Sequence, residues 1–399
     1  MMNTNHEEVT QMKQTIRPGA TIGLLGGGQL GRMIALAGTN LGYRFVTLEP
    51  TLDSPCGQVA EQIQADYSDV QAARELAARA DVITYEFENV NAEVASLLEE
   101  LSYVPQGSQL LYTTQHRLRE KRAIEAAGVK VAPYAEIRSE QELQEAVDKL
   151  GIPSVLKTVM GGYDGKGQWV IRQASEIPEA YATLSQAGTE LVLEQFISFE
   201  KEISVIAARS PRGEVITFPP AENMHIDNIL HASIVPARIS NAVLEEAQQL
   251  AGRIAVSMGA VGLLAVELFL TAEGELYVNE LAPRPHNSGH YTMEACSTSQ
   301  FEQHVRAICN LPLSPVKLLT PVVMVNVLGE HLDAVVGHLV EGNWMQDGQD
   351  INVIPKVHLY GKEEPSAKRK MGHINLLCDQ VEDGLEFIQK TNIWRHQQG

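Results

Sequence analysis

The chain contains few cysteines and lacks a long apolar run, and each absence excludes a class of protein. Its four cysteines lie far apart among 399 residues and form no CxxC spacing. This pattern disfavours a structural zinc site or a disulfide framework and fits a reducing compartment. No stretch approaches the ~18 consecutive apolar residues that a membrane-spanning helix requires. The N-terminus also lacks the layout of a secretory signal. We therefore expect a cytoplasmic protein with no membrane partner and a flexible polar tail over residues 1–17.

Basic residues are also scarce. Lysine and arginine total 31 against 50 aspartates and glutamates, so the formal net charge at pH 7 is -19. Because binding to nucleic acid requires a basic face, nucleic acid is not an expected partner. A protein this acidic that binds a phosphorylated small molecule must gather its few cations locally. Lysines and arginines beside glycine-rich segments are therefore the most informative charges in the chain.

The N-terminal part of the chain alternates between apolar runs and helical patterns, which predicts a Rossmann-like parallel sheet with helices on both faces. The apolar runs are 20–25, 44–48 and 81–85, and a helical pattern covers 30–41. Ligands of such sheets bind at the carboxyl ends of the strands. That edge would bring Gln29, Glu49 and Glu86 together, so we expect a small-molecule site there.

Two glycine-rich segments follow predicted strands and favour different ligands. The first, GGGQLG at 26–31, is typical of a dinucleotide-binding turn. The second, GGYDGKGQ at 161–168, comes after a strand that ends at Lys157 and carries a lysine of its own, Lys166. Backbone N–H groups of such a loop surround phosphate oxygens while lysines supply positive charge. The second segment therefore predicts an ATP-using protein, whereas the first alone would favour an NAD-linked dehydrogenase with Glu49 on the ribose.

A predicted hairpin brings two acidic residues together. Apolar runs at 263–270 and 275–281 flank the turn sequence TAEG, which is typical of two antiparallel strands. Pairing about this turn places Glu267 nearly opposite Asn279 and Glu280, with cross-strand neighbours ~5 Å apart. Two carboxylates this close repel each other unless a cation lies between them. Mg²⁺ binds one or two carboxylates together with nucleotide phosphates. We predict a magnesium site at Glu267 and Glu280; the alternative is a solvated acidic pair on an edge hairpin.

Six motifs together resemble the ATP-grasp superfamily and, within it, the N5-carboxyaminoimidazole ribonucleotide synthetases of purine biosynthesis. They are GGGQLGRM at 26–33, GGYDGKGQ at 161–168, EQFI at 194–197, NMHIDNIL at 223–230, NELAPRPHNSGH at 279–290 and KRKMGHINL at 368–376. The resemblance implies an ATP-grasp fold of mixed α/β and α+β structure in three domains. These are a Rossmann-like N-terminal domain at 18–114, a small lid and central domain at 115–197, and an α+β C-terminal domain at 198–399 that ends in a substrate-binding subdomain.

The resemblance also implies contacts for individual residues. For ATP, the phosphates would contact Arg117 and Lys157, and the ribose would contact Glu202, with His225, Asn279 and Glu280 nearby. The lid over the phosphates would consist of Gly162, Tyr163, Asp164, Gly165, Lys166, Gly167 and Gln168. Adenine would contact Glu194, Gln195, Phe196 and Ile197. Ala282 replaces an asparagine that many ATP-grasp enzymes use as a metal ligand, so Asn279 or water would complete the magnesium shell. Bicarbonate would contact Arg284, His286 and Asn287, and aminoimidazole ribonucleotide would contact Gln29, Glu86, Tyr163, Asp164, Lys362 and Arg369, the last two through its phosphate.

The implied reaction is ATP-dependent carboxylation of aminoimidazole ribonucleotide with bicarbonate through carboxyphosphate, carried out by a homodimer. The predicted catalytic residues are Lys157, Arg284, His286 and Asp164, of which His286 or Asp164 would accept the amine proton. Competing functions are a different ATP-grasp ligase, such as a formate-using glycinamide ribonucleotide transformylase or a biotin carboxylase, a dehydrogenase, and an inactive nucleotide-binding regulator. Simpler interpretations of single residues also stay open, namely an exposed helix face for Arg117, a surface position for Lys157, structural histidines at His225 and His286, and solvated charges at Lys362 and Arg369.

Overall fold

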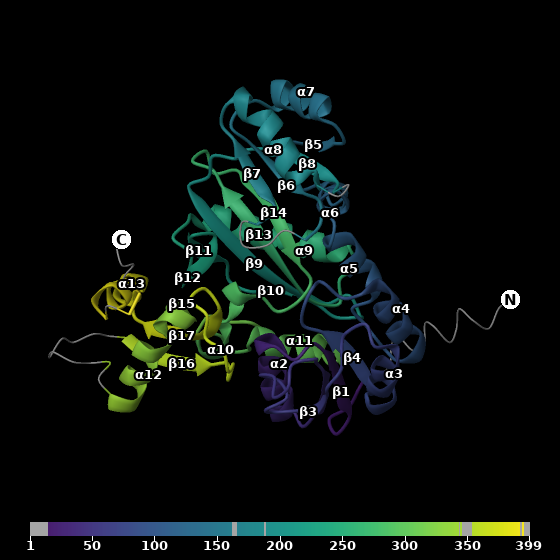
Figure 1. The fold of residues 1–399 in the computed structure, drawn as a ribbon. Helices are drawn as coiled ribbons and strands as arrows, with labels where there is room; N and C mark the ends of the chain where they lie inside the picture. Colours follow the sequence, from purple (N-terminus) through teal and green to yellow (C-terminus); the bar gives the residue numbers. More distant parts are fainter. Residues whose placement is uncertain are drawn as a thin grey trace.

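The computed structural model arranges the chain in three β-sheets with helices packed around them (Figure 1). It describes residues 15–161, 166–186, 189–342, 344, 353–391 and 393–394. Figure 1 shows the small sheet at the top, the N-terminal sheet at the lower right and the last strands of the chain at the lower left, with the long strands of the large sheet between them. Across these described ranges, no helix combines the length and the apolar character needed to cross a bilayer.

The N-terminal sheet is parallel, as predicted, and its strand order is β3-β2-β1-β4. Its elements are β1 (Thr21–Leu25), α2 (Gln29–Asn40), β2 (Arg44–Leu48), β3 (Glu61–Ile63), α3 (Val70–Arg79), β4 (Val82–Tyr85) and α4 (Ala92–Leu101). Leu25, the last residue of β1, pairs with Leu48 of β2 and Tyr85 of β4. The three residues that follow, Gly26, Glu49 and Glu86, therefore leave the sheet at the same edge, and the predicted rim is confirmed.

The small sheet is antiparallel, with the order β5-β8-β6-β7. It consists of β5 (Tyr134–Ile137), α7 (Glu140–Leu150), β6 (Ser154–Thr158), β7 (Gln168–Ile171), α8 (Ile177–Leu184) and β8 (Leu191–Gln195). Ser139 caps α7 by accepting from Glu142 N at 3.1 Å. The Glu142 carboxylate accepts from Arg138 N, one residue before the Ser139 N–H that it would bind in a capping box.

The large sheet has nine strands in the order β14-β13-β9-β11-β12-β15-β17-β16, with β10 beside β9. The strands are β9 (Lys201–Arg209), β10 (Val215–Thr217), β11 (Ala221–Ile226), β12 (Ile229–Val235), β13 (Gly262–Leu270), β14 (Leu276–Ala282), β15 (Val322–Leu328), β16 (Val353–Leu359) and β17 (Lys370–Cys378). The helices around it are α9 (Asn241–Ser257), α12 (Leu332–Glu341) and α13 (Val381–Lys390). Strand β16 pairs with β17 along its whole length, from Val353 to Leu359.

Four helices link the sheets and thereby position the site. The linking helices are α5 (Ser108–Thr114), α6 (Arg117–Ala126), α10 (Thr292–Ala295) and α11 (Gln300–Ile308). Helix α6 begins at Arg117, because Gln115 ends α5 as its C-cap and its side chain donates to Val90 O at 3.2 Å. Phe301 and Val305 of α11 share one core with Ile22 and Ile34 of the N-terminal domain. That core holds the glycine segment 26–31 against the large sheet.

Gly38 of α2 provides a test of this shared core. A Cβ at Gly38 would lie 2.8 Å from Phe45 Cε2 and 3.3 Å from Val305 Cγ2. Overfilling of a packed core costs ~1–3 kcal/mol, so we expect Gly38→Ala to lower the free energy of unfolding by about that amount. A Cβ at Gly337 of α12 meets nothing within 4 Å, so Gly337→Ala is expected to stabilise by ~0.5–1 kcal/mol. Thermal denaturation of both variants measures the two effects, and equal shifts in melting temperature would contradict the prediction.

Candidate active site

The predicted carboxylate pair is confirmed. Glu267 of β13 pairs directly with Glu280 of β14, and a register shift immediately beyond it pairs Leu268 with Val278. Asn279 is therefore the extra residue of a bulge and has no partner of its own in the ladder. Burial, reinforced by the carboxylates of Glu280 and Glu202, raises the pKa of Glu267 well above its usual value. This electrostatic strain is what a bound cation would relieve.

Residues from two other elements bring positive charge to this pair. Arg117, the first residue of α6, donates from Nε to Thr158 O at 3.2 Å, and its Nη1 lies 3.8 Å from Glu280 Oε2. Lys157 of β6 is buried and lies 2.9 Å from Glu194 Oε2. The end of the small sheet therefore faces the hairpin, and an anionic ligand there would meet both the cations and the acidic pair.

Glu194 has a role that its motif did not predict. The resemblance places it on an adenine-facing strand, but successive side chains of a strand point to opposite faces, and the Glu194 carboxylate is buried while Gln195 and Phe196 are exposed. Its two oxygens lie 2.9 Å from Lys157 Nζ and 3.1 Å from Lys121 Nζ. Burial alone would raise the pKa of Glu194, but the two ammonium groups more than offset it and lower the pKa to about 2.

Glu120 is a second buried acid that sequence reasoning missed. It lies on α6 and accepts from Leu281 N at 3.3 Å, next to Glu280. Burial first, and then the Glu280 carboxylate, raise its pKa to about 8 although Arg117 and Lys121 act in the opposite direction. The charged sequence RLREKR resembles an exposed helix face, yet Leu118, Glu120 and Lys121 are all buried. The sequence carried no signal of this burial, because the partners of Glu120 and Lys121 lie far away in the chain.

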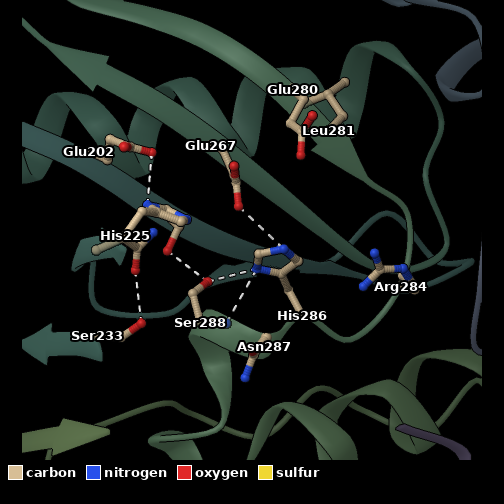
Figure 2. A network of polar contacts seen from close by, with 12 residues as sticks. Glu202, His225, Ser233, Glu267, Glu280, Leu281, Arg284, His286, Asn287 and Ser288 are labelled. Carbon is tan, nitrogen blue, oxygen red and sulfur yellow. Dashed lines mark hydrogen bonds and ion pairs between the residues drawn. The ribbon is translucent and has the colours of Figure 1, made fainter. Parts of the chain in front are cut away.

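Two histidines contact carboxylates of the large sheet (Figure 2). His286 Nε2 lies 3.3 Å from Glu267 Oε1, and His225 Nδ1 lies 3.1 Å from Glu202 Oε2. Burial, followed by the charges of Arg284 and Lys370, lowers the pKa of His286 well below its usual value. In Figure 2, His286 points toward Glu267, and Arg284 lies to the right of His286. Glu202, the predicted ribose ligand, thus has a partner in the predicted nucleotide residue His225.

The turn after β14 is fixed from the N-terminal domain. Arg284 Nη2 forms an ion pair with Glu88 Oε1 at 2.5 Å, and Gln106 Nε2 donates to Pro283 O at 3.1 Å. Glu88 was not predicted, although it stands two residues after the predicted Glu86. Asn287 and Asn326 exchange two amide hydrogen bonds of 3.0 and 2.8 Å. A bicarbonate ligand at Arg284 would therefore share the guanidinium with Glu88.

The backbone N–H groups of the first glycine segment already bind carboxylates of the protein itself. Glu86 accepts from Gly28 N and, at 2.5 Å, from Gly31 N, while Glu49 accepts from Gly27 N at 2.8 Å. A Cβ at Gly28 would lie 2.7 Å from Glu86 Oε1. Because these carboxylates occupy the N–H groups that would bind a pyrophosphate, the segment does not fit a dinucleotide, and the dehydrogenase interpretation loses its main support.

The two predicted residues of the C-terminal segment, Lys362 and Arg369, differ in their surroundings. Burial, followed by the charge of Arg369, lowers the pKa of Lys362 to about 8, and the Glu86 carboxylate acts in the opposite direction. Lys362 Nζ donates to Lys370 O at 2.8 Å, and the exposed Arg369 donates to Glu364 O at 2.8 Å. Lys362 thus lies within electrostatic reach of Glu86, on the edge where Gln29 begins α2.

Part of the second glycine segment lies outside the described residues. Gly162, Tyr163, Asp164 and Gly165 belong to that part. Of the rest, Lys166 and Gln168 are exposed, and Gly167 O accepts from Thr158 N at 2.8 Å. The described residues contain no cluster of three or more histidine, cysteine or acidic side chains that would hold a metal unaided. The Glu267–Glu280 pair, with oxygens only, fits a hard cation that also takes phosphate and water ligands.

Comparisons with known proteins agree with this geometry. Three family models match successive parts of the chain: the ribonucleotide synthetase preATP-grasp domain at 19–115, the ATP-grasp domain at 122–301, and the phosphoribosylaminoimidazole carboxylase C-terminal domain at 322–386. The predicted ATP-grasp fold with its N-terminal parallel sheet is therefore confirmed.

Whole-length relatives make the assignment more specific. The N5-carboxyaminoimidazole ribonucleotide synthase of Bacillus subtilis is 49% identical over 97% of this chain and 98% of its own length. A crystal structure of the ADP complex of an N5-carboxyaminoimidazole ribonucleotide synthetase matches with 52% identity and a TM-score of 0.90, covering 97% of this chain and all of that one (100%). An Aspergillus clavatus enzyme, solved with ADP and 5-aminoimidazole ribonucleotide, matches with 29% identity and a TM-score of 0.84 over 95% of this chain and 98% of its own. The chain belongs to the N5-carboxyaminoimidazole ribonucleotide synthase family of ATP-grasp ligases.

Proposed function

We propose that this chain carboxylates 5-aminoimidazole ribonucleotide with bicarbonate at the expense of ATP, giving N5-carboxyaminoimidazole ribonucleotide, ADP and phosphate. The observation that carries the proposal is the pairing of Glu267 with Glu280 beside Arg117 and Arg284. One face of the hairpin thereby meets the cations expected for ATP, and the following turn holds the arginine expected for bicarbonate. The named relatives supply the substrate, since they match this chain over nearly its whole length.

In the first step a bicarbonate oxygen attacks the γ-phosphorus of ATP. A new O–P bond forms, the bond from the γ-phosphorus to the β–γ bridging oxygen breaks, and ADP leaves with that oxygen, so the other product is carboxyphosphate. The chain contributes mainly position and charge, as is general for phosphoryl transfer. Lys157 and Arg117 bind phosphate oxygens, while Arg284 orients the planar bicarbonate through its fork of N–H groups.

Glu267 and Glu280 are the residues that would hold Mg²⁺, and the raised pKa of Glu267 fits a carboxylate that lacks a cation. The bound ion supplies positive charge to the phosphate oxygens. Glu120 hydrogen bonds to the backbone of Leu281, so it fixes the strand that carries Glu280. The neighbouring Arg117 then bridges this strand and the phosphates.

In the second step the exocyclic amine of aminoimidazole ribonucleotide attacks the carboxyl carbon. The new N–C bond forms as the C–O bond to phosphate breaks, and the amine releases one proton. Carboxyphosphate hydrolyses readily, so a lid over 162–168 must exclude water during this step. Gln29, Glu86, Lys362 and Arg369 would bind the ribonucleotide at the edge of the N-terminal sheet, and Asn287 would complete the bicarbonate pocket.

Release of ADP tests the proposal. Purified full-length protein is mixed with ATP, magnesium and bicarbonate, with and without aminoimidazole ribonucleotide. Glycinamide ribonucleotide with formate, and biotin, serve as alternative acceptors. We expect strong stimulation by aminoimidazole ribonucleotide alone. Stimulation by a different acceptor would keep the fold and change the substrate, and no ATP turnover under any condition would reject the enzyme assignment.

We also propose a cytoplasmic homodimer, which is what the family resemblance implies. The monomer mass is 43.7 kDa. Sedimentation equilibrium is expected to give twice this mass, and a monomer at micromolar concentration would contradict the dimer.

A further inference from the structure

The ring of His286 caps a short helix, and this contact shows which of its nitrogens is unprotonated. A 3-10 turn spans Asn287–Gly289, and Nδ1 of His286 accepts from the backbone N–H of Ser288 at 3.4 Å. A backbone N–H can only donate. The Nδ1 atom therefore presents its lone pair to Ser288, and a proton on that nitrogen would point directly at a second donor.

Two buried serines reinforce this arrangement, and Figure 2 shows the one next to the ring, Ser288. Ser288 Oγ lies 2.8 Å from His286 Nδ1, and Ser204 Oγ of β9 donates to Ser288 Oγ at 2.7 Å. Their exposed fractions are 1% and 2%. Because the Ser288 oxygen already accepts from Ser204, its own hydrogen is available for Nδ1. The chain of hydroxyls thus runs in one direction, toward the ring.

The remaining proton of a neutral imidazole then sits on Nε2, the nitrogen that faces Glu267 Oε1 at 3.3 Å. We propose that His286 is a positioning residue whose Nε2–H orients the carboxylate of Glu267, with its tautomer fixed by Ser288 and Ser204. Resting on the proposed function, this assignment removes His286 as acceptor of the amine proton, because the nitrogen that faces the site already carries a hydrogen. Outer hydrogen bonds of this kind commonly orient metal-binding side chains.

The tautomer can be measured without activity. Two-bond ¹⁵N–¹H correlation of the full-length, metal-free protein with ¹⁵N-labelled histidine distinguishes protonated from unprotonated ring nitrogens. The chain has 12 histidines, and the pattern absent from a His286→Asn sample is that of His286. We expect protonation at Nε2 alone. Protonation at Nδ1, or at both nitrogens, would overturn the proposal.

Three replacements separate the donor role from a proton-accepting role. Asparagine at 286 keeps an oxygen that can cap the helix but lacks the donor toward Glu267, whereas glutamine reaches Glu267 with an amide N–H. Loss of an outer-shell partner typically costs ~10–100-fold, so we expect that loss of kcat for His286→Asn and His286→Ala, and a loss below about tenfold for His286→Gln. Equal losses for all three would show that the ring is needed for proton transfer and would contradict the proposal.

Ser288→Ala tests the relay, by which we mean the hydrogen bonds that run from Ser204 through Ser288 to His286 Nδ1. It is expected to raise the Mg²⁺ concentration needed for half-maximal ADP release by several-fold, while Ser210→Ala leaves it unchanged. Ser210 is a matched control, because it is buried immediately after β9, the strand that carries Ser204, and its hydroxyl donates to Glu214 Oε2 at 3.3 Å. Equal effects of the two variants would contradict the relay. Absence of ATP turnover in the wild-type protein would reject the proposed function and leave the tautomer measurement valid.

Discussion

Replacement of Glu267 by glutamine is expected to remove most ATP turnover and, at the same time, to stabilise the metal-free protein. The amide has the same size and keeps an oxygen that can face His286 Nε2, but it carries no charge. Removing one group that stabilises charge in a transition state lowers kcat by ~10²–10³-fold in measured enzymes. We expect a loss of that order in ADP release stimulated by aminoimidazole ribonucleotide.

The gain in stability follows from the pKa of Glu267. Burial and two neighbouring carboxylates raise this pKa above its unfolded value of 4.5. An acid with a raised folded pKa loses stability as the pH rises from its unfolded pKa to its folded pKa, because the unfolded chain ionises first. The wild-type protein should therefore lose stability over this window and Glu267→Gln should not, so their denaturation midpoints without metal diverge as the pH rises.

Glu273→Gln is the matched control for this prediction. Glu273 is exposed in the turn of the same hairpin, so its replacement should change neither activity nor the pH dependence of stability. A Glu267→Gln variant that keeps full turnover would contradict the metal-site assignment. If Glu267→Gln lowered the stability at neutral pH, the charge of the Glu267 carboxylate would already be offset by positive charges of the protein.

Replacement of Glu194 by glutamine is expected to cause the largest loss of stability in the small sheet. The variant removes the carboxylate charge that both buried ammonium groups, Lys157 and Lys121, contact. Breaking a buried ion pair by removal of one partner typically costs ~3–5 kcal/mol. Hydrogen exchange of the backbone amides of β6 and β8 measures this local free energy of opening directly.

The pH dependence has a sign opposite to that of Glu267. The pKa of Glu194 is lowered to about 2 from 4.5, so its stabilising effect is complete above pH 4.5 and is lost as the pH falls from there toward 2. The difference between wild type and Glu194→Gln should shrink over that window. Glu190→Gln is the control, since the Glu190 side chain is 69% exposed and surface pairs contribute ~0–1 kcal/mol. Equal effects of both variants would mean that the two lysines find other partners.

Local sequence patterns predicted the catalytic hairpin because one turn determines its pairing. The sequence TAEG places Gly274 at a φ of 83°, and counting outward from it brings Glu267 opposite Asn279, one residue from its observed partner Glu280. The bulge next to this pair could not be counted, since register shifts depend on twist and on the neighbouring strand β9. The position of Asn279 therefore became clear only from the structure.

A second hairpin was missed although the sequence carried its signal. The motif NMHIDNIL forms β11 and β12, with Asp227 and Asn228 at φ values of 50° and 62°. A two-residue turn with both φ values positive favours Asn, Asp and Gly. Polar residues in β11 concealed the strand pattern, and Glu222 in particular is paired with Lys201 and Arg238.

The buried charges of α6 could not be predicted for a different reason. Glu120 meets Leu281, and Lys121 meets Glu194; both partners are far away in the sequence. The charged sequence of α6 is typical of an exposed helix, but one face of α6 is buried because the small sheet packs against it. The same reason applies to Glu88, whose partner Arg284 belongs to a different domain.

The transfer of oxygen from bicarbonate to phosphate tests the central claim most directly. Full-length protein is incubated with ATP, magnesium, aminoimidazole ribonucleotide and ¹⁸O-labelled bicarbonate, and the inorganic phosphate is analysed by mass spectrometry. If a bicarbonate oxygen attacks the γ-phosphorus and the carboxyl group then passes to the amine, one labelled oxygen must remain on each phosphate. We predict singly labelled phosphate in the amount of the ADP formed. Unlabelled phosphate in the same amount would contradict carboxyphosphate formation and the site described for it.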